Sequence, residues 1–334
     1  MTIEARKPKD YASAQEVRWC PGCGNYSIIK AVQKVLADAD ARPEDTVFIS
    51  GIGCSSRFPY YMETYGFHTI HGRAAAVATG VKLARPELDV WVVSGDGDSL
   101  AIGGNHLLHL LRRNADLTYL LLNNEIYGLT KGQASPTSRL GTHTPSSPFG
   151  TVDMPVNPAQ FALGAGGRFI ARAVDTGMPL LVATLNRARD FVGTGFVEVL
   201  QNCLVFNDGV FANVEDKTSA KESLLILEHG QPMVFGADRE RGLRLDPARL
   251  ELEVVEIGRN GVTEADILIH DETNRTQAWL LAGCAPPSFP LPAGVLYAAP
   301  DRSFMQRQMA IEAAPERVRE RLAAAMRSGP TWTI

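Results

Sequence analysis

The sequence predicts an α/β protein built on a doubly wound, mostly parallel β-sheet. Short apolar runs recur along the chain, and they lack the polar alternation of strands that face water on one side. Segments whose apolar residues recur with helical spacing separate these runs. Buried strands that alternate with helices are the pattern of a parallel sheet covered by helices on both faces.

The first predicted elements follow a CxxC sequence near the N-terminus. A helix is expected over residues 26–37, whose apolar side chains share one face, and a β-branched strand over 47–50 comes next. A short apolar strand is expected over 67–70. The Ala- and Gly-rich segment 74–84 predicts a helix that packs closely on the sheet, and 90–93 predicts a strand buried on both faces.

Further elements complete the predicted sheet. Residues 100–113 are expected to form a helix that ends near two arginines, where the helix dipole favours cations. The apolar run 117–122 predicts the next strand, so strand, helix and strand form a unit with parallel strands. Strands over 168–174 and 196–200 flank a helix over 178–189, which a proline near its start can open.

The remaining segments have weaker patterns. Residues 135–148 are rich in Pro, Ser and Thr and predict a loop that covers the mouth of the site. Residues 247–294 mix short strands with a Pro-rich stretch, and 315–327 predict a polar helix. We expect one domain over 1–210 that carries the site, and an extension over 211–334 that wraps this domain or contacts a partner.

Composition restricts the partners. The chain has 334 residues, of which 45% are hydrophobic, as is ordinary for a globular protein. Its net charge of −4 argues against nucleic acid as a partner. The N-terminus lacks an apolar signal region, and no apolar run reaches the length of about 18 residues that a membrane span needs. We therefore expect a cytoplasmic protein with no membrane partner.

Polar signatures follow two neighbouring predicted strands. Gly-Asp-Gly at 95–97 comes after the first strand, and Asn-Asn at 123–124 ends the second. Because the carboxyl ends of parallel strands meet at one edge of a sheet, Asp96 and Asn124 can converge on one ion. Their oxygens, together with a backbone carbonyl that we assign to Ile126, suit Mg²⁺. Either signature alone is typical of a turn, but the pair at this helix-length separation is the signature of thiamine diphosphate binding.

Two further features suit a diphosphate. Gly97, Gly103 and Gly104 lack a Cβ, which lets the backbone approach phosphate oxygens. Backbone N–H groups near residues 127–130 can add a nest for the same oxygens.

The chain has five cysteines, and four of them form a second candidate site. Cys20-Pro-Gly-Cys23 contains a turn that can point both thiols at one spot, and Cys54 and Cys203 each follow an apolar run closely. A disulfide is disfavoured because cytosolic thiols stay reduced. A tetrahedral Zn²⁺ site and an iron–sulfur cluster both take four such ligands, and spacing does not separate them. Cys284 is expected to be a buried, small apolar residue.

The predicted coenzyme favours the iron–sulfur alternative. Decarboxylation of a 2-oxoacid on thiamine leaves an electron-rich intermediate. If that intermediate is oxidised one electron at a time, a redox centre must lie nearby. Zn²⁺ cannot accept electrons, whereas an iron–sulfur cluster can.

Residues 16–250 resemble the β subunits of 2-oxoacid:ferredoxin oxidoreductases. The motifs that carry the resemblance are Trp19-Cys-Pro-Gly-Cys-Gly24, Gly51-Ile-Gly-Cys-Ser55, His68-Thr-Ile-His-Gly-Arg-Ala74, Gly95-Asp-Gly-Asp98 and Asn124-Glu-Ile-Tyr-Gly-Leu-Thr-Lys-Gly-Gln133. The resemblance implies Mg²⁺ held by Asp96, Asn124 and the Ile126 carbonyl, and a [4Fe–4S] cluster held by Cys20, Cys23, Cys54 and Cys203. It implies thiamine diphosphate contacts from Gly53, Cys54, Ser55, His71, Gly95, Asp96, Gly97, Asp98, Asn124, Tyr127, Gly128, Leu129 and Thr130.

The resemblance also implies a reaction. The segments around His71 and residues 130–133 are most like those of 2-oxoglutarate and general 2-oxoacid members. The implied reaction converts 2-oxoglutarate, coenzyme A and oxidised ferredoxin to succinyl-CoA, CO₂ and reduced ferredoxin, and in reverse it would fix CO₂ in a reductive citric acid cycle. Pyruvate or another 2-oxoacid as the substrate, and a non-redox thiamine-dependent decarboxylase, are the alternatives.

Thiamine catalysis has a second requirement, a glutamate that binds N1′ of the aminopyrimidine. In thiamine enzymes this residue comes from a separate pyrimidine-binding domain, for which this chain has no room. The resemblance assigns the glutamate, and part of the coenzyme A and substrate site, to an α subunit. We expect an αβ dimer of dimers, and no turnover by the isolated chain.

His71 and Arg73 are the candidate catalytic residues. Both follow the strand expected over 67–70, and either can contact the cofactor or a substrate carboxylate, for which Arg has the better geometry. The alternative is that both lie on the surface or at an interface.

Overall fold

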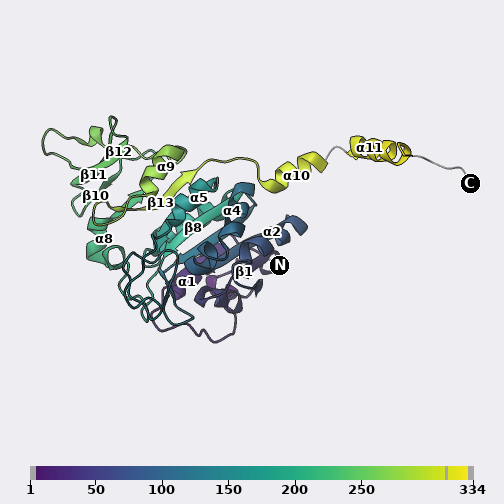
Figure 1. Cartoon of the computed structure of the whole chain (residues 1–334), viewed down its shortest axis with the longest axis horizontal. Helices are drawn as coiled ribbons and strands as arrows, with labels where there is room; N and C mark the ends of the chain where they lie inside the picture. Colours follow the sequence, from purple (N-terminus) through teal and green to yellow (C-terminus); the bar gives the residue numbers. More distant parts are fainter. Residues whose placement is uncertain (1–4, 313–314, 330–334) are drawn as a thin grey trace, which may run out of the picture.

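The computed structural model describes residues 5–312 and 315–329 and shows an eight-stranded sheet as its central layer (Figure 1). In spatial order its strands are β2 (Tyr65–His68), β1 (Thr46–Ser50), β3 (Asp89–Gly95), β4 (Leu117–Asn123), β8 (Thr194–Leu200), β7 (Phe169–Val174), β13 (Leu291–Ala298) and β9 (Leu224–Leu227). Neighbouring strands are parallel, except that β7 and β13 are antiparallel. The predicted doubly wound, mostly parallel sheet is confirmed.

Helices cover both faces of this sheet. Those of the main body are α1 (Asn25–Asp38), α2 (Ala74–Ala84), α3 (Asp96–Leu100), α4 (Gly104–Arg113), α5 (Pro158–Gly164), α6 (Met178–Asp190), α7 (Ala212–Glu215), α8 (Lys217–Ser223) and α9 (Arg275–Ala282). One core cluster joins the sheet to α2, α4, α5 and α9, and a second joins it to α1 and α6. Successive strand residues alternate between the two clusters, Phe48 and Trp91 on one side and Ile49 and Val92 on the other.

Most predicted elements are confirmed, and α2 has the predicted bounds. The helix predicted over 100–113 is wrong at its N-terminal end, because the chain turns between α3 and α4. Gly103 permits this turn, since a Cβ there would overlap the carbonyl oxygen of Asp98. The strand expected over 67–70 is β2, which begins earlier and lies exposed at the edge of the sheet.

The C-terminal part of the chain is not confined to the surface. It adds β9 and β13 to the main sheet, and it also forms a small antiparallel sheet that the sequence pattern did not resolve into strands. The strands of this second sheet are β10 (Val234–Phe235), β11 (Arg241–Asp246) and β12 (Glu251–Glu256). The division at residue 210 stays a prediction, although two strands beyond it are integral to the main sheet.

The last two helices, α10 (Phe304–Glu312) and α11 (Pro315–Arg327), extend away from the main body (Figure 1). Helix α11 has the predicted bounds. Among the described residues, 3₁₀ segments occur at Pro8–Tyr11, Pro43–Asp45, Cys54–Tyr61 and Glu264–Asp266. No helix in the described part of the chain is both long and apolar enough to cross a bilayer.

A buried ion pair joins β7 to β8 close to the carboxyl ends of the strands. Glu198 accepts hydrogen bonds from Arg172 Nε at 2.8 Å and from Asn123 Nδ2 at 2.9 Å. The side chains of Arg172 and Glu198 are only 4% and 2% exposed, so water cannot replace a lost partner. The pair therefore fixes Asn123, which immediately precedes the predicted metal ligand Asn124.

Replacement of Glu198 by Ala should lower the free energy of unfolding by about 3–5 kcal/mol, because it leaves the Arg172 guanidinium buried without a counter-charge. Denaturant unfolding of the purified chain measures this loss. The matched control is Glu253→Ala, which removes the solvent-exposed pair with Arg244 and should change stability little. Equal losses in the two variants would contradict the prediction.

Candidate functional site

The carboxyl ends of β1, β3, β4 and β8 meet at one edge of the sheet, and a cavity of about 120 Å³ opens there. Its lining contains all of the residues that the family resemblance assigns to thiamine diphosphate, from Gly53 after β1 to Thr130. Ile126 also lies in this wall. Segments that are far apart in the sequence therefore meet as predicted, while the role of each residue stays a prediction.

Asp96, the first residue of α3, is buried in this cavity wall. Its Oδ2 lies 2.6 Å from the hydroxyl of Thr137, which also lies 3.1 Å from Oδ1 of Asn123. Burial raises the pKa of Asp96 above its ordinary range, and hydrogen bonds from Ser135 and Thr137 offset this only in part. A carboxylate in this state gains most from a cation that shares its charge.

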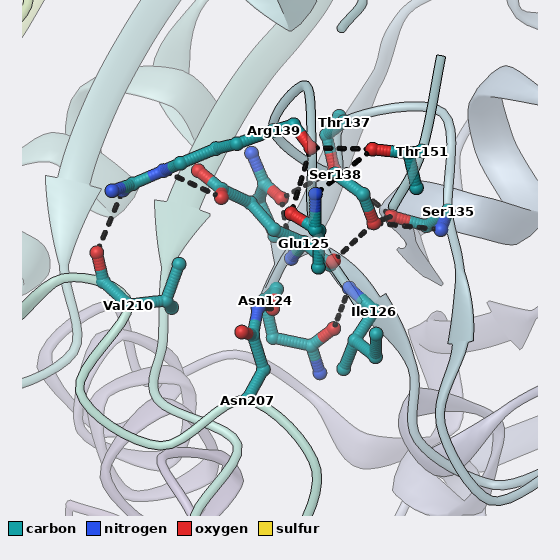
Figure 2. A network of polar contacts seen from close by, with 12 residues as sticks. Asn124, Glu125, Ile126, Ser135, Thr137, Ser138, Arg139, Thr151, Asn207 and Val210 are labelled. Carbon is teal, nitrogen blue, oxygen red and sulfur yellow. Dashed lines mark hydrogen bonds and ion pairs between the residues drawn. The ribbon is translucent and has the colours of Figure 1, made fainter. Parts of the chain in front are cut away.

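The second predicted metal ligand lies in a tight turn after β4 (Figure 2). Oδ1 of Asn124 accepts a hydrogen bond from the backbone N–H of Ile126 at 3.2 Å, and its carbonyl oxygen accepts one from Asn207 Nδ2 at 2.9 Å. Glu125, which lies between Asn124 and Ile126 in the sequence, has a left-handed φ of +55°, and this conformation reverses the chain. The short hairpin of β5 (Ile126–Tyr127) and β6 (Gln133–Ala134) follows and fixes the turn.

The predicted loop over 135–148 holds this turn from outside the cavity. Figure 2 shows Ser138 donating to the carbonyl oxygen of Glu125, and Arg139 reaching both Glu125, at 2.9 Å, and the carbonyl oxygen of Val210. Burial raises the pKa of Glu125 to about 7, although the Arg139 guanidinium lowers it. The loop thus packs on the turn that carries Asn124 and Ile126. None of its residues lines the cavity, so its predicted position over the mouth of the site gains no support.

Asp98 is a second buried carboxylate, but it binds backbone. Its Oδ1 accepts hydrogen bonds from the N–H groups of Ile52 at 3.1 Å and Gly72 at 2.8 Å, and its Oδ2 accepts one from Ser94 at 2.8 Å. These bonds leave little capacity for a further ligand. Asp98 lines the cavity as predicted, and its carboxylate holds together the segments after β1, β2 and β3.

Gly97 is required for a close approach. A Cβ at this position would overlap the ring of Tyr127, whose hydroxyl donates to the Gly97 carbonyl oxygen at 3.2 Å. This contact joins the start of α3 to the hairpin that follows Asn124. The missing Cβ at Gly97 thus makes room for the ring of Tyr127. The contact of Gly97 with a phosphate stays a prediction.

The structure separates the two candidate catalytic residues. His71 is exposed and lies in the wall of the cavity. Arg73 is absent from that wall and instead contacts the ring of His106 on α4. This placement gives no support to Arg73 as a catalytic residue, because an adjacent helix already binds its guanidinium.

Four cysteines line a second pocket, of about 230 Å³. The turn predicted between Cys20 and Cys23 is present, with Gly22 at φ +81° and the Cys23 N–H donating to the Cys20 carbonyl. Cys54 and Cys203 both lie beside Gly128, where a Cβ would lie 3.6 Å from each of their sulfurs. The fifth cysteine, Cys284, is buried elsewhere, and its thiol donates to a carbonyl of its own segment.

Burial affects these thiols in the same direction. It raises the pKa of Cys23 to about 11, and it also raises the pKa of Cys54, with neighbouring cysteines adding to both shifts. A thiolate in this pocket therefore needs a bound cation. Among the described residues, no three Cys, His, Asp or Glu side chains are arranged to hold a single metal ion.

The two cavities are adjacent. They share a wall made of Cys54, Asn124, Gly128, Leu129 and Gln201. One predicted ligand of the magnesium ion and one predicted ligand of the cluster therefore belong to both cavities. A group bound in the first cavity and a group bound in the second would be separated by these residues.

Sequence reasoning missed three polar residues of this region. Thr137 contacts Asp96, and Asn25 and Gln201 line the cysteine pocket. Thr137 lay in a segment predicted only as a covering loop, because nothing in a Pro- and Ser-rich run specifies where it folds back. Asn25 and Gln201 each lie within two positions of a predicted cysteine ligand, and that proximity in sequence is the signal that could have found them.

Fold and site together define a thiamine diphosphate-binding domain. In agreement, residues 51–199 match the family described as thiamine pyrophosphate enzyme, C-terminal TPP binding domain. The chain is 52% identical over 270 residues to the 2-oxoglutarate oxidoreductase subunit KorB of Mycobacterium tuberculosis, covering 81% of this chain and 71% of that one. It is 48% identical over 190 residues to a 2-oxoacid:ferredoxin oxidoreductase β subunit of Aeropyrum pernix, covering 57% and 60%.

A solved structure is similar over almost the whole chain. It is the 2-oxoglutarate:ferredoxin oxidoreductase of Magnetococcus marinus with 2-oxoglutarate, coenzyme A and succinyl-CoA bound, at 31% identity and a TM-score of 0.77, covering 98% of each chain. The present chain belongs to the family of 2-oxoacid:ferredoxin oxidoreductase β subunits, with 2-oxoglutarate enzymes among its relatives. It is therefore a subunit of a thiamine diphosphate-dependent oxidoreductase.

Proposed function

We propose that this chain is the β subunit of a 2-oxoglutarate:ferredoxin oxidoreductase. The complex would convert 2-oxoglutarate and coenzyme A to succinyl-CoA and CO₂ and pass the electrons through a [4Fe–4S] cluster to ferredoxin, and in the reverse direction it would fix CO₂. When bound, thiamine diphosphate supplies the nucleophilic carbon that decarboxylates the 2-oxoacid, and the cluster supplies a one-electron acceptor.

The donor set fits a magnesium-bound diphosphate. We assign Mg²⁺ to Asp96, Asn124 and the carbonyl of Ile126, and these three residues all line one cavity. These are the oxygen ligands that Mg²⁺ prefers. The desolvated state of Asp96, expressed in its raised pKa, gives a physical reason for a cation at this position.

The cysteine pocket supports an iron–sulfur cluster. Four thiols surround one pocket, which is adjacent to the cavity that contains Asp96. An iron–sulfur cluster in this place can accept an electron, whereas Zn²⁺ cannot. Cys20 is exposed, so this side of the pocket is open to an external electron acceptor.

The shared wall carries the proposal. Electron transfer from a substrate on the coenzyme needs an acceptor nearby, and Cys54, Asn124 and Gln201 belong to both cavities. A decarboxylase that transfers no electrons has no use for this adjacency. The second candidate, a non-redox thiamine-dependent decarboxylase, is therefore the weaker one.

An α subunit completes the proposed site. We call the cavity of about 120 Å³ the coenzyme cavity. Its described residues would provide metal and phosphate contacts, and no glutamate among them could bind the aminopyrimidine. Ile102, at 61% exposed, and His71 form part of the rim. We propose that the α subunit covers this rim and supplies the activating glutamate and part of the substrate and coenzyme A site, in an αβ dimer of dimers.

The test is an assay of the co-purified αβ complex against a panel of 2-oxoacids, with coenzyme A and a viologen dye as the electron acceptor. We expect 2-oxoglutarate to be the best substrate, and about four irons and four sulfides for each β chain. The β chain alone should give no turnover. Zinc in place of iron, or 2-oxoacid decarboxylation without dye reduction, would contradict the proposed electron transfer. A preference for pyruvate would contradict the assignment of 2-oxoglutarate as the substrate.

A further inference from the structure

The side chain of Asn25 is buried beside the cysteines without a hydrogen-bond partner. It is 0% exposed, and neither Nδ2 nor Oδ1 has a partner among the described residues. Asn25 lines the same pocket as Cys20, Cys23, Cys54 and Cys203. Both ends of the carboxamide are free, so either orientation of the amide leaves a donor available there.

The backbone at Asn25 also provides a hydrogen-bond donor to the cysteines. Asn25 is the first residue of α1, and its backbone N–H donates to the thiol of Cys23. The start of a helix carries partial positive charge from its free N–H groups, which favours an anionic group in front of it. The carboxamide thus adds a second donor to a helix terminus that already binds one cysteine sulfur.

An unmatched carboxamide in this position is costly. A buried donor or acceptor without a partner loses its bonds to water without replacement, and the great majority of buried polar atoms in native proteins have partners. Gln201 adds a third unpartnered atom, its buried Oε1, to the lining of the same pocket. The wall of the pocket is therefore built for a polar occupant that the chain itself does not provide.

We propose that Asn25 donates a hydrogen bond to a sulfur of the cluster, and that this bond raises the reduction potential of the cluster. The inference depends on the proposed function, because it assumes that the four cysteines hold an iron–sulfur cluster. Reduction adds one negative charge to the cluster, so a donor at sulfur stabilises the reduced form more than the oxidised form. The donor then makes the cluster a better acceptor of electrons from the adjacent coenzyme cavity.

The experiment uses the αβ complex with Asn25→Leu, which removes the donor, and Asn25→Asp, which keeps the shape but replaces the donor by an acceptor. Iron and sulfide content shows whether the cluster is retained, and a redox titration followed by electron paramagnetic resonance gives its midpoint potential. Both variants should keep iron and shift the potential to more negative values, Asn25→Asp by more because it adds charge. A purely structural role would change iron content or thermal stability and leave the potential unmoved.

Gln33→Leu is the matched control, because Gln33 is an amide on the same helix that lines neither cavity. Its potential should equal that of the wild type. A wild-type potential in an Asn25 variant that retains its cluster would overturn the proposal. Absence of iron from the wild-type complex would instead overturn the proposed function, so the two failures are distinguishable.

Discussion

Replacement of Cys203 by Ser is expected to remove the cluster from the αβ complex while thiamine diphosphate stays bound. Cys203 reaches the pocket from the segment after β8, and it lines the cysteine pocket but not the coenzyme cavity. Loss of a residue that only hydrogen-bonds to a metal ligand typically costs about 10- to 100-fold in metal affinity or activity. Loss of a ligand itself should therefore lower the rate of dye reduction by at least about 100-fold. Iron content, bound thiamine and viologen reduction are the three measurements.

Cys284→Ser is the matched control for this variant. Cys284 is equally a free thiol, but it is buried away from both cavities and donates to the carbonyl of Leu280 at 3.6 Å. Its replacement should leave iron content and dye reduction at the wild-type level. If Cys203→Ser retained full iron and activity, the cysteine pocket would not be a cluster site. If it lost thiamine along with iron, the two cavities would be parts of one binding unit.

Replacement of Asp96 by Asn should abolish cofactor binding without destabilising the cofactor-free chain. The carboxylate is buried, and its raised pKa means that ionisation costs free energy in the folded state when no cation is present. Since the folded pKa lies above the unfolded one, this cost is absent at acid pH and grows as the pH rises past the unfolded pKa. An amide of the same shape removes the cost and also removes the charge that binds Mg²⁺.

Thermal unfolding with and without thiamine diphosphate and Mg²⁺ measures this effect. A ligand at about 100 times its Kd stabilises the native state by about 2.7 kcal/mol, and Asp96→Asn should lose that gain completely. In the absence of ligand, Asp96→Asn should be at least as stable as the wild type. Asp98→Ala is the contrasting variant and should be less stable even without ligand, because it leaves the N–H groups of Ile52 and Gly72 without an acceptor. Retained cofactor stabilisation in Asp96→Asn would contradict the assignment of Asp96 as a metal ligand.

Much of the architecture was predictable from local patterns. The buried strands have continuous apolar runs, and α2 begins and ends where its Ala-rich composition predicts. The error at α3 and α4 has a specific cause. The apolar spacing of residues 100–113 continues through Gly103. At the turn between α3 and α4, Gly103 lies so close to the backbone of Asp98 that a Cβ would not fit, and the spacing of apolar side chains does not reveal such a backbone contact.

The candidate site likewise has features that were predictable from the sequence and features that were not. The positions of Asp96 and Asn124 were predictable because two parallel strands in one βαβ unit must present their carboxyl ends at one edge. The environment of Asp96 was not predictable, because Thr137 comes from a loop whose path depends on contacts with Glu125 and Val210. Likewise, Arg73 follows a predicted strand and was a reasonable candidate, but α4 places His106 against it.

By itself the sequence determined the fold class, the coenzyme signature and the four cysteines, since each of these is a pattern of nearby residues with a fixed local consequence. Only the tertiary structure decided that the two cavities share a wall, that Asp98 binds backbone, and that the Asn25 amide is buried without a partner. These features depend on which segments distant along the chain pack together. Packing of that kind is set by the three-dimensional fit of the whole core, and the spacing of residues along one strand or helix does not encode it.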